Sequence, residues 1–178
     1  LPRFANCSFA AAYPFGQVLL SDPGVPVRVR LEAFNPLVPT DADASGLPVA
    51  VLRYHLTNPT RQKIDISVCG SVPNFIGTDG KEGAPSKNRN RFRQLKNLNG
   101  VFMDSRGVDP KAAQWGSMAL SPAAKTGLSA RTAWLKACWG TSQLGFWDDC
   151  AHSGRLENRQ AAGIGATMAS LAVTTCLA

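Results

Sequence analysis

Residues 29–72 read VRLEAFNPLVPTDADASGLPVAVLRYHLTNPTRQKIDISVCGSV. Three strand-like runs, 27–33, 49–56 and 64–69, are separated by two breaks rich in turn residues. In each run apolar side chains alternate with polar or charged ones, the period of two that is typical of a strand with one buried face. The break at 35–48 holds three prolines, which cannot donate to a sheet ladder. The stretch therefore predicts a three-stranded β-meander that forms the nucleus of the core.

Further strand-like runs follow this stretch. They cover 115–120, 130–139 and Ala169–Leu177, with proline and glycine between them, and Leu144–Arg155 is typical of a short helix ending in a turn at Gly154. The pattern predicts a mostly-β protein, an antiparallel β-sandwich with long loops and one short helix. The apolar run Ala169–Leu177 has no turn residue or polar tail, so we expect an unpaired edge that promotes aggregation.

Length and composition are those of a soluble globular protein. A chain of 178 residues forming one domain buries about 70% of its unfolded surface, which is enough for a substantial core. Apolar residues make up 44%, and the mean hydropathy is −0.08. No apolar run reaches the roughly 18 residues that span a bilayer. We therefore expect a single domain, 1–178, without a transmembrane segment.

The segment 73–111 has an unusual charge. Its eight Lys and Arg residues against four carboxylates contribute +4 of the formal net charge of +7. The motif KNRNRFR at 87–93 is the best argument for nucleic-acid binding, because clustered cations release counterions from phosphate and an aromatic ring stacks on a base. A charge run alone is a weak footprint, however. A long solvated loop between strands, with Phe92 packed onto a sheet, is the favoured interpretation.

Three tryptophans, Trp134, Trp139 and Trp147, lie within fourteen residues of sequence. Exposed aromatic side chains on a β-sandwich are one way to bind the face of a sugar. This leaves a free-standing carbohydrate-binding sandwich open as an alternative function. Large aromatic residues more often fill a core or an interface, and that interpretation is favoured here.

The carboxylates do not form a recognisable hydrolytic pair. Glycoside hydrolysis normally requires two carboxyl groups about 5 to 10 Å apart across the scissile bond. Asp148 and Asp149 are the only adjacent acidic pair, and neighbouring side chains diverge by about 100° on a helix or point to opposite faces of a strand. A turn or capping role is favoured for this pair. Glu32 fits the polar face of a strand and Glu157 a turn, so no catalytic residue is assigned.

Metal and cofactor sites are equally absent from the sequence pattern. His55 and His152 are far apart, without a nearby acid or thiol at a recognisable spacing, so no metal-ligating or cofactor-binding residue is assigned and no cofactor is expected. Arg53 and His55 share one face of a predicted strand. Asp65 on the next run is a candidate partner for either side chain.

The cysteines show neither a complete disulfide framework nor the spacing of a zinc site. They number five, an odd count without Cys-x-x-Cys spacing, and stand at positions 7, 69, 138, 150 and 176. Free buried thiols in a reducing compartment such as the cytoplasm are the default for such a set. The sequence carries no other information on compartment.

A family resemblance is carried by several phrases of this sequence. The phrases are AFNPLVPTDADASGLPVAVLRYHLTNPT at 33–60, RFANCSFAAAYPFGQVLLSDPGVPV before it at 3–27, GSMAL at 116–120, and FWDD at 146–149 through GRLE at 154–157. In this order they resemble the N-terminal domain of family 116 glycoside hydrolases, which include the non-lysosomal glucosylceramidase, also called bile-acid β-glucosidase. The resemblance covers most of the chain, and the basic segment matches least.

The resemblance implies that 1–178 is a non-catalytic N-terminal domain and a piece of a longer enzyme. In that family the glutamate nucleophile and the aspartate acid/base lie in a C-terminal helical barrel, and no stretch here matches their motifs. The implied partner is that barrel, with a β-glucoside or glycolipid such as glucosylceramide bound near the interface. The implied parent enzyme is a retaining β-glucosidase. The tryptophans and the proline-rich loop Asn35–Pro48 are the expected contacts.

Overall fold

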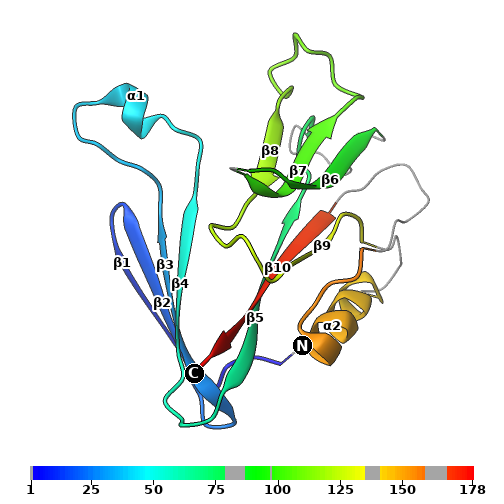
Figure 1. Cartoon of the computed structure of the whole chain (residues 1–178). Helices are drawn as coiled ribbons and strands as arrows, with labels where there is room; N and C mark the ends of the chain where they lie inside the picture. The colour runs from blue at the N-terminus through cyan, green and yellow to red at the C-terminus, as the bar shows by residue number, and fades with distance from the viewer. Residues whose placement is uncertain (1, 79–86, 97, 135–140, 159–167) are drawn as a thin grey trace. The chain divides into compact units, whose positions relative to one another are not determined.

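The computed structural model describes residues 2–78, 87–96, 98–134, 141–158 and 168–178. Its Cα positions divide into two compact units. Unit 1 contains Leu1–Ile64 with Cys176–Ala178, and unit 2 contains Asp65–Thr175 (Figure 1). The single domain expected from the sequence stays a prediction, and each unit is described by itself.

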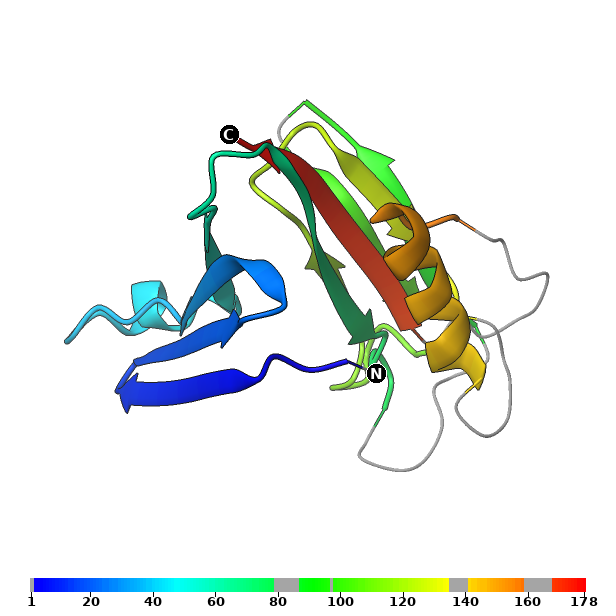
Figure 2. The ribbon, with the colours of Figure 1, turned by 90° about the horizontal axis from the view of Figure 1, so that it is seen from below.

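Unit 1 is built on a four-stranded antiparallel sheet with the order β1-β2-β3-β4. Its strands are β1 (Asn6–Ala12), β2 (Phe15–Asp22), β3 (Val25–Phe34) and β4 (Val51–Thr57). Figure 2 shows that consecutive strands in this sheet are neighbours in space. The register places Phe9 opposite Val18, Val18 opposite Leu31, and Leu31 opposite Tyr54. These four side chains therefore share one face of the sheet.

The proline-rich break between β3 and β4 is an ordered connection with a short helix, α1 (Ala42–Ser45). Asp41 caps this helix, because its carboxylate accepts a 2.8 Å hydrogen bond from the backbone N–H of Ala44. The Ser45 hydroxyl accepts from the Val38 N–H at 3.0 Å and donates to the Val38 carbonyl at 2.9 Å. These bonds hold the two arms of the connection together at its tip.

Unit 2 contains two three-stranded sheets with the orders β5-β10-β9 and β6-β7-β8. The strands of the first are β5 (Ile64–Pro73), β9 (Leu128–Arg131) and β10 (Met168–Leu177). Those of the second are β6 (Asn88–Gln94), β7 (Asn99–Ser105) and β8 (Ser117–Leu120).

The hydrophobic core lies between these two sheets. Val101 and Met103 of β7 are completely buried and pack with Ala130 of β9 and with Ala169 and Leu171 of β10. Because the cluster joins strands from both sheets, unit 2 is a β-sandwich. The predicted fold class, mostly β with antiparallel sheets, is confirmed.

The predicted short helix is α2 (Thr141–Ser153). It ends where Gly154 adopts a φ of +67°, a left-handed conformation that glycine reaches without a Cβ clash. The Gly154 N–H donates to the Cys150 carbonyl at 2.9 Å and so closes the last turn. The helix prediction and its end are confirmed, and the helix begins a few residues earlier than predicted.

The predicted β-meander is wrong in its third strand. The first two runs pair as β3 and β4, but the third run is β5, which pairs with β10 in unit 2. Alternation shows which face of a strand is buried, and it does not identify the partner strand. The main core is accordingly in unit 2 and not in the meander. Ala169–Leu177 is also not an unpaired edge, because β10 is the central strand of its sheet.

The basic segment 73–111 is not the predicted long loop. It contains the antiparallel hairpin of β6 and β7, in which Arg91 stands opposite Phe102. Phe92 is partly buried against the core cluster, as predicted. The arginines alternate with Asn90 and Phe92, so one face of β6 is charged and the other faces the core. Residues 79–86 lie outside the described ranges.

Candidate functional site

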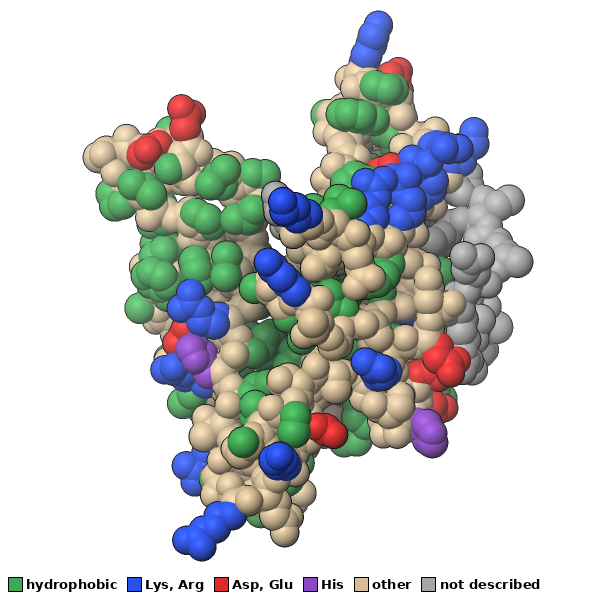
Figure 3. Space-filling view, viewed as in Figure 1, with side chains coloured by type: hydrophobic (Ala, Val, Ile, Leu, Met, Phe, Trp, Pro, Cys, Tyr) green, Lys and Arg blue, Asp and Glu red, His purple; other side chains and the backbone are tan. Residues whose placement is uncertain are grey.

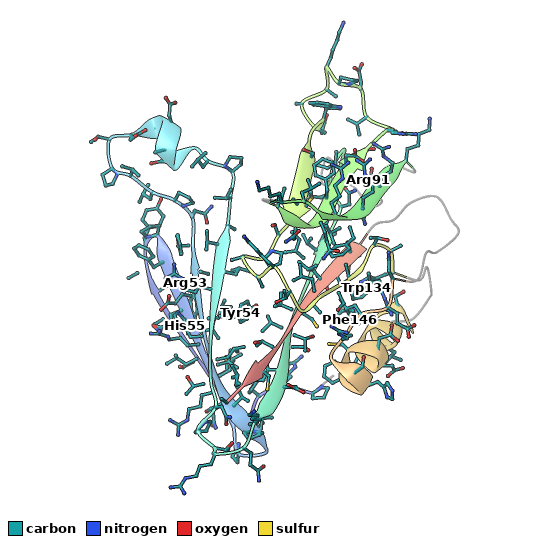
Figure 4. The ribbon with its side chains drawn as sticks, in the orientation of Figure 1. Arg53, Tyr54, His55, Arg91, Trp134 and Phe146 are labelled. Atoms are coloured by element: carbon teal, nitrogen blue, oxygen red, sulfur yellow. The ribbon has the colours of Figure 1, made fainter. Side chains whose placement is uncertain are left out.

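The sheet of unit 1 has one charged face and one apolar face. Arg53 and His55 lie on one side of β4 and Tyr54 on the other (Figure 4). The register aligns Arg53 with Glu32 of β3, and His55 with Arg30. The shared face predicted for Arg53 and His55 is thus confirmed. Their shared partner is Glu32 and not the predicted Asp65, which belongs to a strand of a different sheet.

Glu32 is the centre of an ion cluster on the charged face. Its carboxylate lies 3.0 Å from His55 Nε2, 3.4 Å from an Arg30 guanidinium nitrogen and 3.8 Å from one of Arg53. The hydrogen bond from His55 is the largest cause that lowers the pKa of Glu32, and the positive charges of His55, Arg30 and Arg53 add to it. Glu32 is therefore held in its ionised form.

A hollow of about 460 Å³ lies at one end of the charged face, over residues 10–12, 15–17, 32–34 and 53. The register places Gln17, Glu32 and Arg53 in one row across the sheet. Phe15 and Phe34 form a parallel row two residues away, with ring centroids 6.0 Å apart. The hollow is the trough between these rows, so one wall is polar and the other aromatic.

The sequence pattern placed Glu32 and Arg53 on polar strand faces, but it did not single out Phe15, Gln17 or Phe34. The signal was present in the phase of β3, because Phe34 alternates with the same parity as Glu32 and shares its face. The register that brings Phe15 and Gln17 beside them is a cross-strand property that local periodicity does not contain. A second and broader hollow over the other end of this sheet is bordered by the cations Arg28 and Arg30.

Large apolar side chains are exposed on the β3–β4 connection and on the apolar face. Those on the connection are Leu37, Val38, Leu47 and Val49, and those on the sheet are Phe9, Leu52 and Tyr54. Figure 3 shows apolar side chains gathered over the connection, with acidic side chains at its tip. Leu47 itself is 54% exposed, and the segment 47–52 around it contains no charged side chain.

Asp148 and Asp149 both lie within α2, so the predicted turn or capping role is wrong. Asp149 forms an ion pair with Arg131 of β9, whose side chain is 3% exposed. Arg131 also donates to the backbone carbonyls of Gly145 at 3.1 Å and Glu157 at 3.2 Å. Asp148 is exposed, so the two carboxyl groups do not form a facing pair. The ion pair between Arg131 of β9 and Asp149 links α2 to the sheet.

Comparison with known proteins supports the resemblance seen in the sequence. The family model described as "beta-glucosidase 2, glycosyl-hydrolase family 116 N-term" matches residues 2–178. The chain belongs to the family 116 N-terminal domain family. No curated protein matches the chain.

In this family 116 N-terminal domain, Trp134 has a structural role. Its ring stacks on Phe146 of α2 at a centroid distance of 4.9 Å and an interplanar angle of 16° (Figure 4). Its indole N–H donates to the buried Ser170 hydroxyl at 2.8 Å. This agrees with the favoured core interpretation. Trp139 lies outside the described residues, and Trp147 is half-buried on α2.

The arginines of β6 in the family 116 domain are largely engaged within the domain. Arg89 makes two hydrogen bonds to the Asp104 carboxylate, at 2.9 and 2.6 Å, and Arg91 makes one at 2.7 Å. The guanidinium groups of Arg91 and Arg93 lie 5.4 and 4.7 Å from the Phe102 ring centroid. Lys and Arg side chains gather over β6 and β7 in Figure 3. The contacts favour a structural role over the phosphate binding that the sequence left open.

The described cysteines divide into a contacting pair and two exposed residues. The sulfur atoms of Cys69 and Cys150 lie 3.0 Å apart, whereas Cys7 and Cys176 are exposed. The expectation of buried thiols is therefore wrong for Cys7 and Cys176. Cys138 lies outside the described residues.

The described ranges contain no group of three or more His, Cys, Asp or Glu side chains close enough to hold a metal ion. Neither helix in this part of the family 116 domain has the length and apolar character that crossing a membrane requires. The absence of catalytic, cofactor and metal residues stays a prediction from the sequence.

Proposed function

We propose that this chain is a non-catalytic domain whose task is to pack against the catalytic region of the same glycoside hydrolase. The observation that carries the proposal is the exposed apolar surface of the β3–β4 connection, formed by Leu37, Val38, Leu47 and Val49. Soluble monomers rarely leave such residues gathered in one place, and apolar patches of this kind mark interaction sites. The match to an N-terminal domain family supplies the partner, because a domain of that kind accompanies a catalytic region.

The non-catalytic part of the proposal is supported by the carboxylates. The acid of a glycosidase requires a raised pKa so that it carries a proton to the leaving group. Glu32 has a lowered pKa, and Asp149 is committed to the buried Arg131. Neither group is suited to that task. We therefore place the reaction in the catalytic region.

The reaction and substrate of the whole enzyme are also part of the proposal. The family description names a β-glucosidase, which supports hydrolysis of β-glucosides. Glucosylceramide is the specific substrate proposed, in a retaining reaction of carbohydrate metabolism. The N-terminal domain borders the mouth of the active site through the β3–β4 connection.

Binding between separately expressed pieces tests the docking role. The 178-residue chain is titrated calorimetrically against the downstream region of its own coding sequence. We expect saturable binding that Leu47→Asp weakens at least about tenfold, because a charge is then buried without a partner. Leu95→Asp is the matched control, since Leu95 is 55% exposed and lies in unit 2. No binding, or equal weakening by both substitutions, would overturn the docking surface.

A further inference from the structure

The hollow on the charged face of unit 1 has two chemically different walls. One wall consists of Phe15 and Phe34, whose rings are tilted by 51° to one another. The other consists of Gln17, Glu32 and Arg53. The two rows are two residues apart along the strands, which separates them by about 7 Å.

The floor of the trough is formed by small residues. Gly16 and Ala33 stand opposite one another between the two rows, and their side-chain positions point to the other face. A Cβ at Gly16 would meet the Phe9 ring at 3.5 Å, which places that side of Gly16 on the apolar face. The backbone is thus open to a ligand between the walls.

The polar wall keeps hydrogen-bonding capacity for a ligand. The side chain of Arg53 is 60% exposed and lies 3.8 Å from the Glu32 carboxylate, so this ion pair leaves guanidinium N–H groups open to a ligand. Arg53 and the Gln17 amide can donate hydrogen bonds to a ligand, and the Glu32 carboxylate can accept hydrogen bonds from it. Phe15 is 61% exposed, so its ring face is also available.

This combination selects one ligand chemistry. A purely apolar ligand would remove water from Glu32 and Arg53 without replacing their hydrogen bonds. A small anion could pair with Arg53 but would leave both aromatic rings without a partner. A neutral sugar ring has an apolar C–H face for the aromatic wall and a rim of hydroxyls that both donate and accept. Its two sides match the two walls.

We propose that this hollow binds one ring of a neutral pyranoside, stacked on Phe15 and Phe34 and hydrogen-bonded to Gln17, Glu32 and Arg53. The volume of about 460 Å³ falls within the range of roughly 300 to 1,000 Å³ that is typical of small-ligand sites. The site is open and has few polar groups, so its affinity is in the millimolar range. This binding is independent of the docking role proposed above.

Amide NMR on the 178-residue chain tests the site. The probe is methyl β-D-glucopyranoside, added to about 100 mM, a concentration well above the expected millimolar Kd. We expect saturable shifts at residues 10–12, 15–17, 32–34 and 53. Glucitol is the control compound, because it has the hydroxyls without the closed ring. No saturation, or the same shifts with glucitol, would overturn the proposal.

Substitutions on opposite faces of the same sheet separate binding from folding. Phe15→Ala should weaken binding roughly tenfold through loss of aromatic stacking. Arg53→Gln should weaken it at least about threefold and leaves both rings in place. Phe9→Ala is the matched control, because Phe9 is 69% exposed on the opposite face, and should leave the Kd unchanged. Wild-type affinity in Arg53→Gln would contradict the proposal even if Phe15→Ala failed to fold.

Discussion

The sulfur atoms of Cys69 on β5 and Cys150 on α2 lie 3.0 Å apart, although 81 residues separate them in the sequence. Burial raises the pKa of the Cys69 thiol to about 12, and the hydrogen bond with Cys150 adds to this effect. Because the thiolate is the reactive form, Cys69 is a poor nucleophile at neutral pH. The contact also fixes one face of α2 against the sheet of unit 2.

The rates at which the cysteines are alkylated test the burial of Cys69. At pH 8, iodoacetamide should modify exposed Cys7 at least about tenfold faster than Cys69, because the folded protein holds Cys69 as the thiol. Mass spectrometry of peptides sampled over time measures both rates in one molecule. In denaturant the two rates should converge. Equal rates in the folded protein would mean that Cys69 is not buried as described.

The neighbouring aspartates of α2 should differ sharply in their effect on stability. Asp149→Asn leaves the Arg131 charge buried without its partner, which costs about 3 to 5 kcal/mol in the free energy of unfolding. Asp148→Asn changes an exposed side chain, and its effect should stay within about 0.5 kcal/mol. Urea unfolding followed by circular dichroism measures both. Similar losses for the two variants would contradict the assigned ion pair.

Glu32 should make the stability of unit 1 depend on acid pH. Its pKa in the folded state lies below the ordinary value of 4.5, so the unfolded chain binds the proton more readily. The stabilisation is therefore fully present above about pH 4.5 and is lost as the pH falls through the lowered value. A carboxyl NMR titration should show the low pKa directly. His55→Gln should return the pKa toward 4.5, and an unchanged value in that variant would exclude His55 as the main cause.

A side chain at Gly127 should destabilise the protein. The φ of Gly127 is +70°, and an added Cβ would overlap the Thr174 carbonyl oxygen of β10. Gly127→Ala should therefore cost more than about 1 kcal/mol in unfolding free energy, because both the conformation and the contact are strained. Gly116→Ala is the control, since a Cβ there meets nothing within 4 Å. The midpoint temperatures of thermal unfolding of the two variants test this prediction. Equal midpoints would contradict the close contact at Gly127.

The hydrophobic periodicity of the sequence predicted which side chains share a face of β3 and β4, but it did not predict which strands pair. Alternation in β3 and β4 placed Arg53 and His55 on one side, as the structure shows. The pairing of β5 with β10 joins segments about a hundred residues apart, and no local pattern records it. β1 was not predicted, because polar and apolar residues alternate only over residues 6–9 before three consecutive alanines.

The way the residues of the candidate site come together could not be predicted from the sequence, for a related reason. The two walls of the hollow come from three strands, and only the register brings Gln17 beside Glu32 and Phe15 beside Phe34. The basic sequence of β6 led to a wrong prediction, because it predicted a loop where the structure has a strand. Its arginines suggested a solvated loop, whereas in the structure they contact Asp104 and Phe102 of the neighbouring strand.

The coding sequence downstream of Ala178 tests the central claim most directly. We predict an open frame of several hundred codons that encodes a helical region with a glutamate and an aspartate suited to retaining hydrolysis. The chain alone should then release no product from a β-glucoside. A stop codon directly after Ala178 would contradict the assignment as a docking domain, and sugar binding by the hollow would become its leading function.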